Sequence, residues 1–148
     1  MPEQCVVDTV ILQKANGLLT KAPGAASLFK RRLALLQRFQ RGELIALKSA
    51  TLIAEYRRQI KAPRNDFIRA FFSLIDHPTR SVENWKSPWS GPNRDAAGKC
   101  RFPREDTHVL RTAIRDSSSS TIFSEEARLV AADACIYRAF GVHLRDLP

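Results

Sequence analysis

Short apolar runs alternate along the chain with longer segments in which apolar residues recur every three or four positions. The short runs predict buried strands over residues 4–8, 44–47, 121–123 and 142–144. The longer segments predict helices over residues 25–41, 49–62, 65–77, 104–114 and 127–140. Short strands that alternate with helices are typical of parallel sheets covered on both faces. We therefore expect a single α/β domain over residues 1–148, with three layers, α/β/α, and a mainly parallel central sheet.

Several predicted helix boundaries carry residues that favour helix ends. Ser49 and either Asn65 or Asp66 can cap the helices that follow them with a side-chain oxygen. Gly42 and Gly141 stand where two helices are expected to stop. These signals support the assignment of the segments between them.

Residues 79–103 follow neither period, and their prolines, glycines and two tryptophans predict one long loop. Aromatic and basic residues are interleaved in and just after it: Trp85, Lys86, Trp89, Arg94, Lys99, Arg101, Phe102 and Arg104. Aromatic rings can stack on nucleobases and basic side chains can pair with phosphates. This pattern therefore makes Trp89, Arg101 and Arg104 candidate nucleic-acid contacts. Two alternatives stay open, namely tryptophans that pack into the core and a surface that binds a partner protein.

Composition places the chain among globular proteins, with 148 residues, 44% hydrophobic and 26% charged side chains. The sequence contains no run of about 18 apolar residues, so we expect no membrane span. The first residues carry no secretory signal pattern. Three cysteines, Cys5, Cys100 and Cys135, are an odd number without paired spacing, so we expect reduced thiols in a cytoplasmic protein. His108 has no metal-ligand spacing with them, and we expect it to be a surface or core histidine.

Basic residues are concentrated in the first half of the chain. The net charge is +9, and residues 30–69 hold 11 basic side chains against 3 acidic ones. Such a field attracts polyanions, of which nucleic acid is the most abundant in a cell. Arg57, Arg58 and Lys61 are therefore candidate RNA contacts, although a solvated helix face would have the same composition.

Carboxylates follow the predicted strands or open the helices after them. They are Asp8, Glu55, Asp106, Glu125 and Glu126. The carboxyl ends of parallel strands share one sheet edge, so we expect these side chains to gather there. Acids that gather in a basic protein need a neutralising partner, and Mg²⁺ or Mn²⁺ prefers such oxygen ligands. Taken singly, an acid in a first helical turn can also serve only the helix dipole.

Four segments resemble, in order, the motifs of PIN-domain nucleases. They are Cys5-Val6-Val7-Asp8-Thr9, the stretch from Leu44 to Glu55-Tyr56, the helix start Glu105-Asp106-Thr107-His108, and Ser124-Glu125-Glu126 after a short strand. Gly141-Val142 resembles the closing strand of the family. The resemblance covers nearly the whole chain except residues 79–103.

The resemblance implies a ribonuclease that depends on Mg²⁺ or Mn²⁺ and cleaves RNA. Members of the family are often the toxin of a toxin–antitoxin pair, which implies an antitoxin or a second copy of the chain as partner. Asp8, Glu55 and Asp106 would be the core metal-binding acids, and Glu126 the fourth, with Glu125 as its rival. The hydroxyls of Ser124 and Thr9 would lie beside the metal. Val10 stands where many members have Asn, and Glu126 where most have Asp. These departures favour an alternative, a catalytically impaired PIN-like module that binds RNA or a protein.

Overall fold

The central feature of the computed structural model, which describes residues 2–148, is a sheet of five strands. All neighbouring strands pair in parallel, and their spatial order is β3-β2-β1-β4-β5. The strands are β1 (Glu3–Val7), β2 (Leu44–Lys48), β3 (Ser81–Glu83), β4 (Ser120–Phe123) and β5 (Val142–Arg145). The predicted parallel sheet is thereby confirmed.

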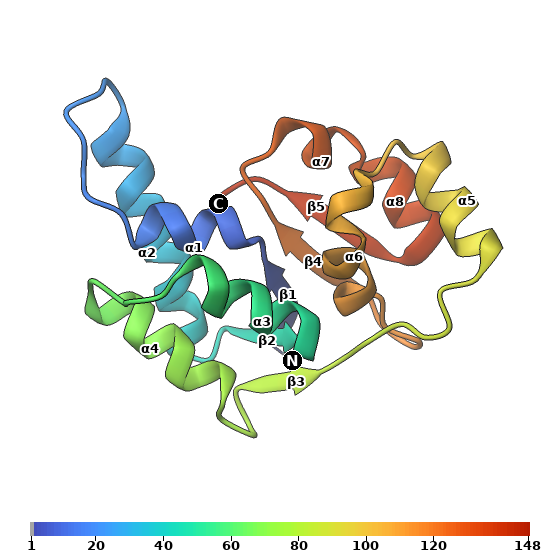
Figure 1. The fold of residues 1–148 in the computed structure, drawn as a ribbon, viewed down its shortest axis with the longest axis horizontal. Helices are drawn as coiled ribbons and strands as arrows, with labels where there is room; N and C mark the ends of the chain where they lie inside the picture. The colour runs from blue at the N-terminus through green and yellow to red at the C-terminus, as the bar shows by residue number, and fades with distance from the viewer. Residues whose placement is uncertain (1) are drawn as a thin grey trace.

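Helices cover this sheet on both faces. They are α1 (Thr9–Ala15), α2 (Ala25–Gln40), α3 (Ala50–Gln59), α4 (Asp66–Ile75), α5 (Gly91–Lys99), α6 (Thr107–Ala113), α7 (Ala127–Ala131) and α8 (Asp133–Phe140), and a 3₁₀ turn (Arg104–Asp106) precedes α6. Figure 1 shows α1 to α4 on the left, α5 to α8 on the right and the strands between them. The three-layer α/β/α architecture expected from the sequence is confirmed.

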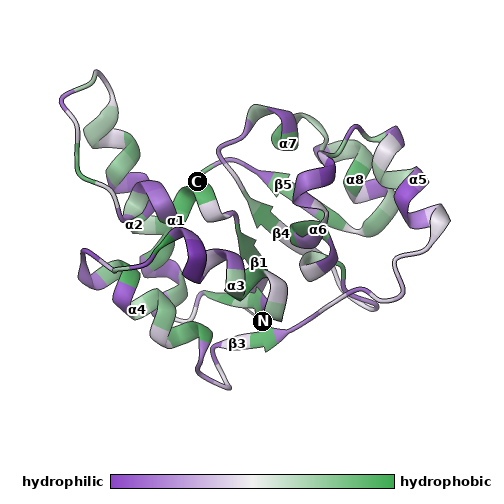
Figure 2. Ribbon diagram, in the orientation of Figure 1, coloured by the Kyte–Doolittle hydropathy of each residue, from purple (hydrophilic) through white to green (hydrophobic). Residues whose placement is uncertain are grey.

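The core lies on both faces of the sheet because the central strands are apolar along most of their length. Val6, Val7, Leu44 and Ile122 are almost completely buried, as expected for strands covered by helices on each side. The hydrophobic colouring of the strands and the hydrophilic colouring of many outer helical residues in Figure 2 agree with this.

The predicted side-chain caps are present at the starts of α3 and α4. The Ser49 side chain accepts a hydrogen bond from the Leu52 amide at 3.2 Å, and Asn65 accepts one from the Ile68 amide at 3.0 Å. Gly141 ends α8 with φ 71°, in the left-handed region that favours glycine. Boundaries read from end signals were therefore reliable at these positions.

The segment 79–103 is not the single loop that its composition predicts. It contains the edge strand β3 and the helix α5, which the Ser90 side chain caps by accepting a hydrogen bond from Asn93 N at 3.3 Å. Pro92 is in the first turn of α5, where proline is compatible with a helix. The helix was missed because only Ala97 of its residues is buried, so no apolar period marks it.

Two other elements differ from the prediction for local reasons. A short helix, α1, follows β1 directly, and the helix expected over 127–140 is divided between α7 and α8. The division lies at Ala132, where the backbone leaves helical geometry with ψ 3°. Neither change alters the layer order.

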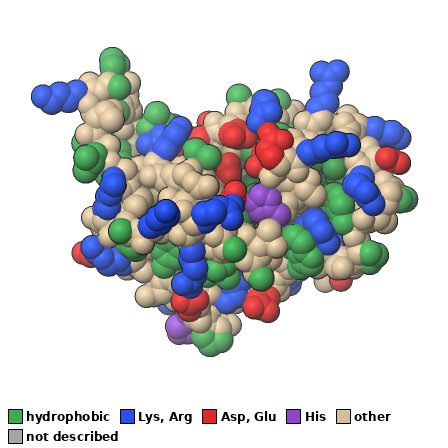
Figure 3. Space-filling model, viewed as in Figure 1, with side chains coloured by type: hydrophobic (Ala, Val, Ile, Leu, Met, Phe, Trp, Pro, Cys, Tyr) green, Lys and Arg blue, Asp and Glu red, His purple; other side chains and the backbone are tan. Residues whose placement is uncertain are grey.

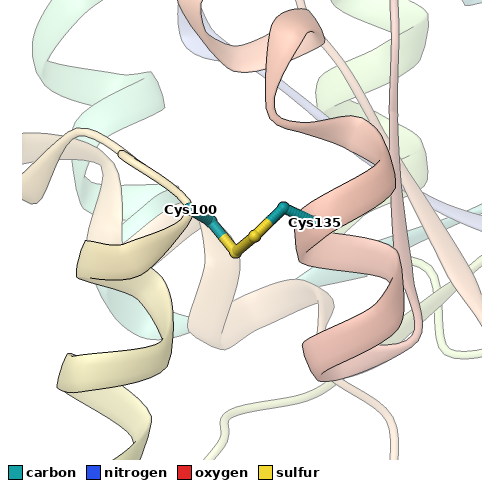
Figure 4. The surroundings of a disulfide bond; sticks show 2 residues. All are labelled: Cys100 and Cys135. Carbon is teal, nitrogen blue, oxygen red and sulfur yellow. A yellow bond between two sulfur atoms is a disulfide. The ribbon is translucent and has the colours of Figure 1, made fainter.

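The expectation of three reduced thiols is wrong for two of them. Cys100, which ends α5, forms a disulfide with Cys135 of α8, with the Cα atoms 5.5 Å apart (Figure 4). The two are 35 residues apart, and a spacing of this kind carries no sign that the two helices meet in space. Cys5 is free and buried, and burial raises the pKa of its thiol well above the usual range.

No helix in residues 2–148 is both long and apolar enough to cross a membrane.

Candidate active site

The strand order creates a switch point between β1 and β4. From β1 the chain proceeds to β2 on one side, whereas β4 lies on the other side. Ligands in sheets of this kind bind beyond the carboxyl ends of the strands at such a point. Asp8 follows β1 and Ser124 follows β4, and the Asp8 amide bonds to the Phe123 carbonyl at 2.9 Å. The predicted position of these two side chains at one sheet edge is confirmed.

Asp8 is held by Ser124 from the neighbouring strand. The Ser124 Oγ donates to Asp8 Oδ2 at 2.8 Å and accepts from the Glu126 amide at 3.0 Å. Asp8 is only 5% exposed. Burial and the charges of Glu126 and Glu55 raise the pKa of Asp8, against the lowering by its hydrogen bonds with Ser124 and the Thr9 backbone. Asp8, Glu55 and Glu126 are therefore close enough for their charges to interact.

Glu55 of α3 is fixed by two donors from other elements. Thr9 Oγ1 donates to Glu55 Oε2 at 2.8 Å, and His108 Nε2 donates to the same oxygen at 2.7 Å. Both side chains are largely covered, with 23% of Glu55 and 19% of His108 exposed. His108 was expected to be a surface or core histidine, and the structure adds that this partly buried residue hydrogen-bonds a candidate site acid.

His108 could have been suspected from its place two residues after Asp106, on the same predicted helix start. The sequence does not reveal its partner, because Glu55 comes from a different helix. The predicted hydroxyl of Thr9 lies at the site as expected, but it contacts Glu55 rather than Asp8.

Asp106 lies at the end of the 3₁₀ turn, where α6 begins. Burial and the charges of Asp8, Glu126 and Glu105 raise its pKa to about 6, although His108 lowers it. We name Asp8, Glu55, Asp106 and Glu126 the acid cluster. Four separate parts of the chain contribute to it, as the sequence predicted.

Two carboxylate oxygens of the acid cluster are buried without a hydrogen-bond partner. They are Asp106 Oδ2 and Glu126 Oε2. Arg128 Nη2 lies 3.7 Å from Glu126 Oε2, which is an ion pair but too long for a hydrogen bond. Buried charged oxygens are costly when no hydrogen bond satisfies them. Each of these two atoms therefore favours a nearby cation, which Arg128 supplies in part at Glu126.

The donor set fits a hard divalent cation in its chemistry. Carboxylate oxygens are the protein ligands that Mg²⁺ and Mn²⁺ prefer, and both ions retain waters. Within residues 2–148, however, no three or more His, Cys, Asp or Glu side chains are arranged as a group that could hold a metal ion. The acid cluster is therefore a set of neighbouring carboxylates whose side chains do not form a ready metal site.

Glu125 is turned to another partner. Its two carboxylate oxygens accept from Arg32 Nε and Nη2 of α2, both at 2.8 Å. Although burial raises the pKa of Glu125, the hydrogen bonds and charge of Arg32 lower it on balance. The structure thus separates Glu125 from the acid cluster and leaves Glu126 in it, which corrects the expectation that the two are rivals for one role.

The candidate RNA contacts lie in two regions. Arg57 on α3 forms an ion pair with Asp76 at 3.6 Å, and Arg58 and Lys61 beside it are exposed. Arg101 and Arg104 are exposed on either side of the buried Phe102–Pro103 pair near the acid cluster. Figure 3 shows acidic side chains beside a histidine in the middle of one face, with lysine and arginine side chains on both sides.

Both tryptophans pack against the protein. Trp89 is partly buried against the core, and its ring stacks on Phe140 with centroids 5.9 Å apart. The Trp85 ring is covered by the Arg111 guanidinium at 4.0 Å. One side of Trp89 therefore packs against the core, as the first of the two alternatives predicted. Trp89 also lines a groove along α5.

Comparison with known proteins adds no family to this geometry. A scan against protein-family models, a search of the curated proteins and a search of the solved structures each gave no match for this chain.

Proposed function

We propose that the protein is a PIN-like ribonuclease that depends on Mg²⁺ or Mn²⁺ and cleaves RNA phosphodiester bonds at the acid cluster. The observation that carries the proposal is the pair of buried oxygens without a hydrogen bond, Asp106 Oδ2 and Glu126 Oε2, in acids whose charges interact with Asp8 at the switch point. The predicted order of the four PIN-like segments supports the same assignment.

The side chains around the site have separable tasks in this proposal. The four acids of the acid cluster would hold the cation, and Ser124 orients Asp8 through its hydrogen bond. Thr9 and His108 orient Glu55 through their hydrogen bonds to its Oε2. A bound divalent cation would supply a Lewis acid for the phosphate and would lower the pKa of a water.

RNA is the proposed substrate because of the charge of the protein and its distribution. The net charge is +9, and a basic surface raises the local concentration of a polyanion around an acidic site. An antitoxin that blocks the site and a homodimer are parts of the proposal that follow from the PIN-like assignment alone. A cytoplasmic location was inferred from reduced thiols, and the Cys100–Cys135 disulfide removes that support.

The test is cleavage of a fluorophore–quencher single-stranded RNA by purified protein. We expect cleavage with Mn²⁺ or Mg²⁺, none with EDTA, and a rate lowered by orders of magnitude in Asp8→Asn. Asp116→Asn is the matched control, since it makes the same change at an exposed position outside the acid cluster. Full activity in Asp8→Asn would contradict the proposal.

A second candidate is an RNA-binding or protein-interaction module with impaired catalysis. It is favoured by the open arrangement of the carboxylates in residues 2–148 and by Val10 beside Asp8. This candidate predicts that the protein binds single-stranded RNA but leaves it intact with Mn²⁺, Mg²⁺ or EDTA.

A further inference from the structure

A groove of about 1030 Å³ runs along α5 toward the start of α6. It has more than twice the volume of the cleft between α3 and α4, about 460 Å³, and of the cleft beyond β2 and β3, about 490 Å³. The groove is formed largely by the segment that the PIN resemblance does not cover.

The groove combines apolar walls with positive charge. Its apolar lining comes from the partly buried Trp89 and from Ala97 and Phe102, which are almost fully buried. Its cations are Arg94, Lys99 and Arg104. Asp95 is the one acidic residue among its lining side chains. Stacking of Trp89 on Phe140 keeps the indole in place, so the apolar wall does not depend on a ligand to hold it.

The cations of the groove are free of acidic partners. Across residues 2–148, the side chains of Arg94, Lys99 and Arg104 form no ion pair, even with Asp95. The cleft between α3 and α4 differs, because its Arg57 and Arg69 already pair with aspartates at 3.6 and 2.9 Å. Unneutralised charge therefore marks the α5 groove as the better site for a polyanion.

The groove reaches the residues on either side of Asp106, although Asp106 itself does not line it. Arg104 and Thr107 line it, and they flank Asp106 in the sequence. Thr107 Oγ1 donates to the Arg104 carbonyl at 2.8 Å, which joins the turn to the start of α6. A chain lying in the groove would therefore come close in space to the turn that carries Asp106.

We propose that the α5 groove binds single-stranded RNA and delivers it to the acid cluster. Phosphates pair with Arg94, Lys99 and Arg104, and a base packs on the exposed part of the Trp89 ring. The inference deepens the proposed function and rests on it.

The first test measures binding of fluorescein-labelled decauridylate by anisotropy in EDTA, so that no cleavage intervenes. Arg94→Gln/Lys99→Gln removes two exposed groove charges and leaves Arg104, next to the acid cluster, unchanged. Lys21→Gln/Arg41→Gln is the matched control at exposed positions outside the groove. We expect the groove variant to bind at least tenfold more weakly and the control within twofold of the unmodified protein.

The dependence of affinity on salt gives a second readout of the same variants. Each lost phosphate contact with a single strand lowers the slope of log K against log salt by about 0.7. The groove variant is expected to lose about 1.4 from the slope, and the control is expected to lose none.

A third measurement tests whether the bound RNA lies against Trp89. The chain has two tryptophans, so Trp85→Phe leaves Trp89 as the single indole. Decauridylate should change the Trp89 emission in this variant, and the change should disappear when Arg94→Gln/Lys99→Gln is added.

The outcomes separate the groove from the proposed function. Equal RNA affinity in the groove variant and the control would overturn the groove, while Mn²⁺-dependent cleavage by the unmodified protein would still support the nuclease. Failure of the unmodified protein both to bind decauridylate and to cleave RNA would overturn both. Tighter binding of deca-glutamate than of decauridylate would also overturn the groove proposal, because the site would then suit an acidic protein.

Discussion

At the scale of single residues, Asp106 carries the largest electrostatic cost of the site. Burial and its acidic neighbours raise its pKa from 3.8 to about 6. Between these values the folded protein binds more protons than the unfolded chain, so this contribution to stability falls as pH rises through the window. At neutral pH the charged Asp106 therefore destabilises the metal-free fold.

Replacing Asp106 by Asn should remove this cost. Because the side chain is half-buried, solvent screening reduces the effect to about 1 kcal/mol at neutral pH. We expect a melting temperature about 2–4 °C higher in EDTA by calorimetry, with the gain disappearing as the pH is lowered to about 4. An unchanged or lower melting temperature at neutral pH would contradict the electrostatic account of this residue.

In the proposed metal site, His108 would position Glu55 through its hydrogen bond, a role that the sequence does not reveal. Groups that orient metal-binding side chains typically change metal affinity or activity by about 10–100-fold when they are lost. His108→Ala should therefore weaken Mn²⁺ binding at least tenfold by isothermal titration. His108→Gln, whose amide can still donate to Glu55, should restore most of the affinity. Equal loss in both variants would show that the ring is needed only for packing.

At the scale of elements, the disulfide ties α5, and with it the groove and the turn before Asp106, to α8. A crosslink across 35 residues limits the unfolded chain and typically stabilises a fold by about 2–4 kcal/mol. Cys100→Ser/Cys135→Ser should lose this amount in urea unfolding.

A reducing agent provides the control for the disulfide. Dithiothreitol should destabilise the unmodified protein and leave the double variant unchanged. The same response to dithiothreitol in both proteins would contradict the pairing.

The elements that the sequence predicted well are those whose burial produces a clear period. The central strands and the helices that Ser49 and Asn65 cap belong to this group. β3 was missed because it is a three-residue edge strand, and α5 because it buries one side chain. Both lie in segment 79–103, where proline and glycine suggested a loop.

At the scale of the whole molecule, the sequence predicted which acids share a sheet edge but not how their side chains are directed. Asp8 and Ser124 could be placed because strand ends in a parallel sheet coincide. Glu125 is kept out of the acid cluster by its ion pair with Arg32 of α2, which lies 93 residues earlier in the chain. The Cys100–Cys135 bond likewise depends on contacts between distant helices, which no local pattern encodes.

The central claim, that the acid cluster binds a divalent cation, is tested most directly by the shift in melting temperature with millimolar Mn²⁺. A ligand that binds only the folded state raises its stability in proportion to the logarithm of its concentration over Kd. We expect a rise of several degrees for the unmodified protein and for Asp116→Asn, and almost none for Asp8→Asn or Asp106→Asn. An equal rise in all four proteins would show that the ion binds elsewhere and would contradict the account.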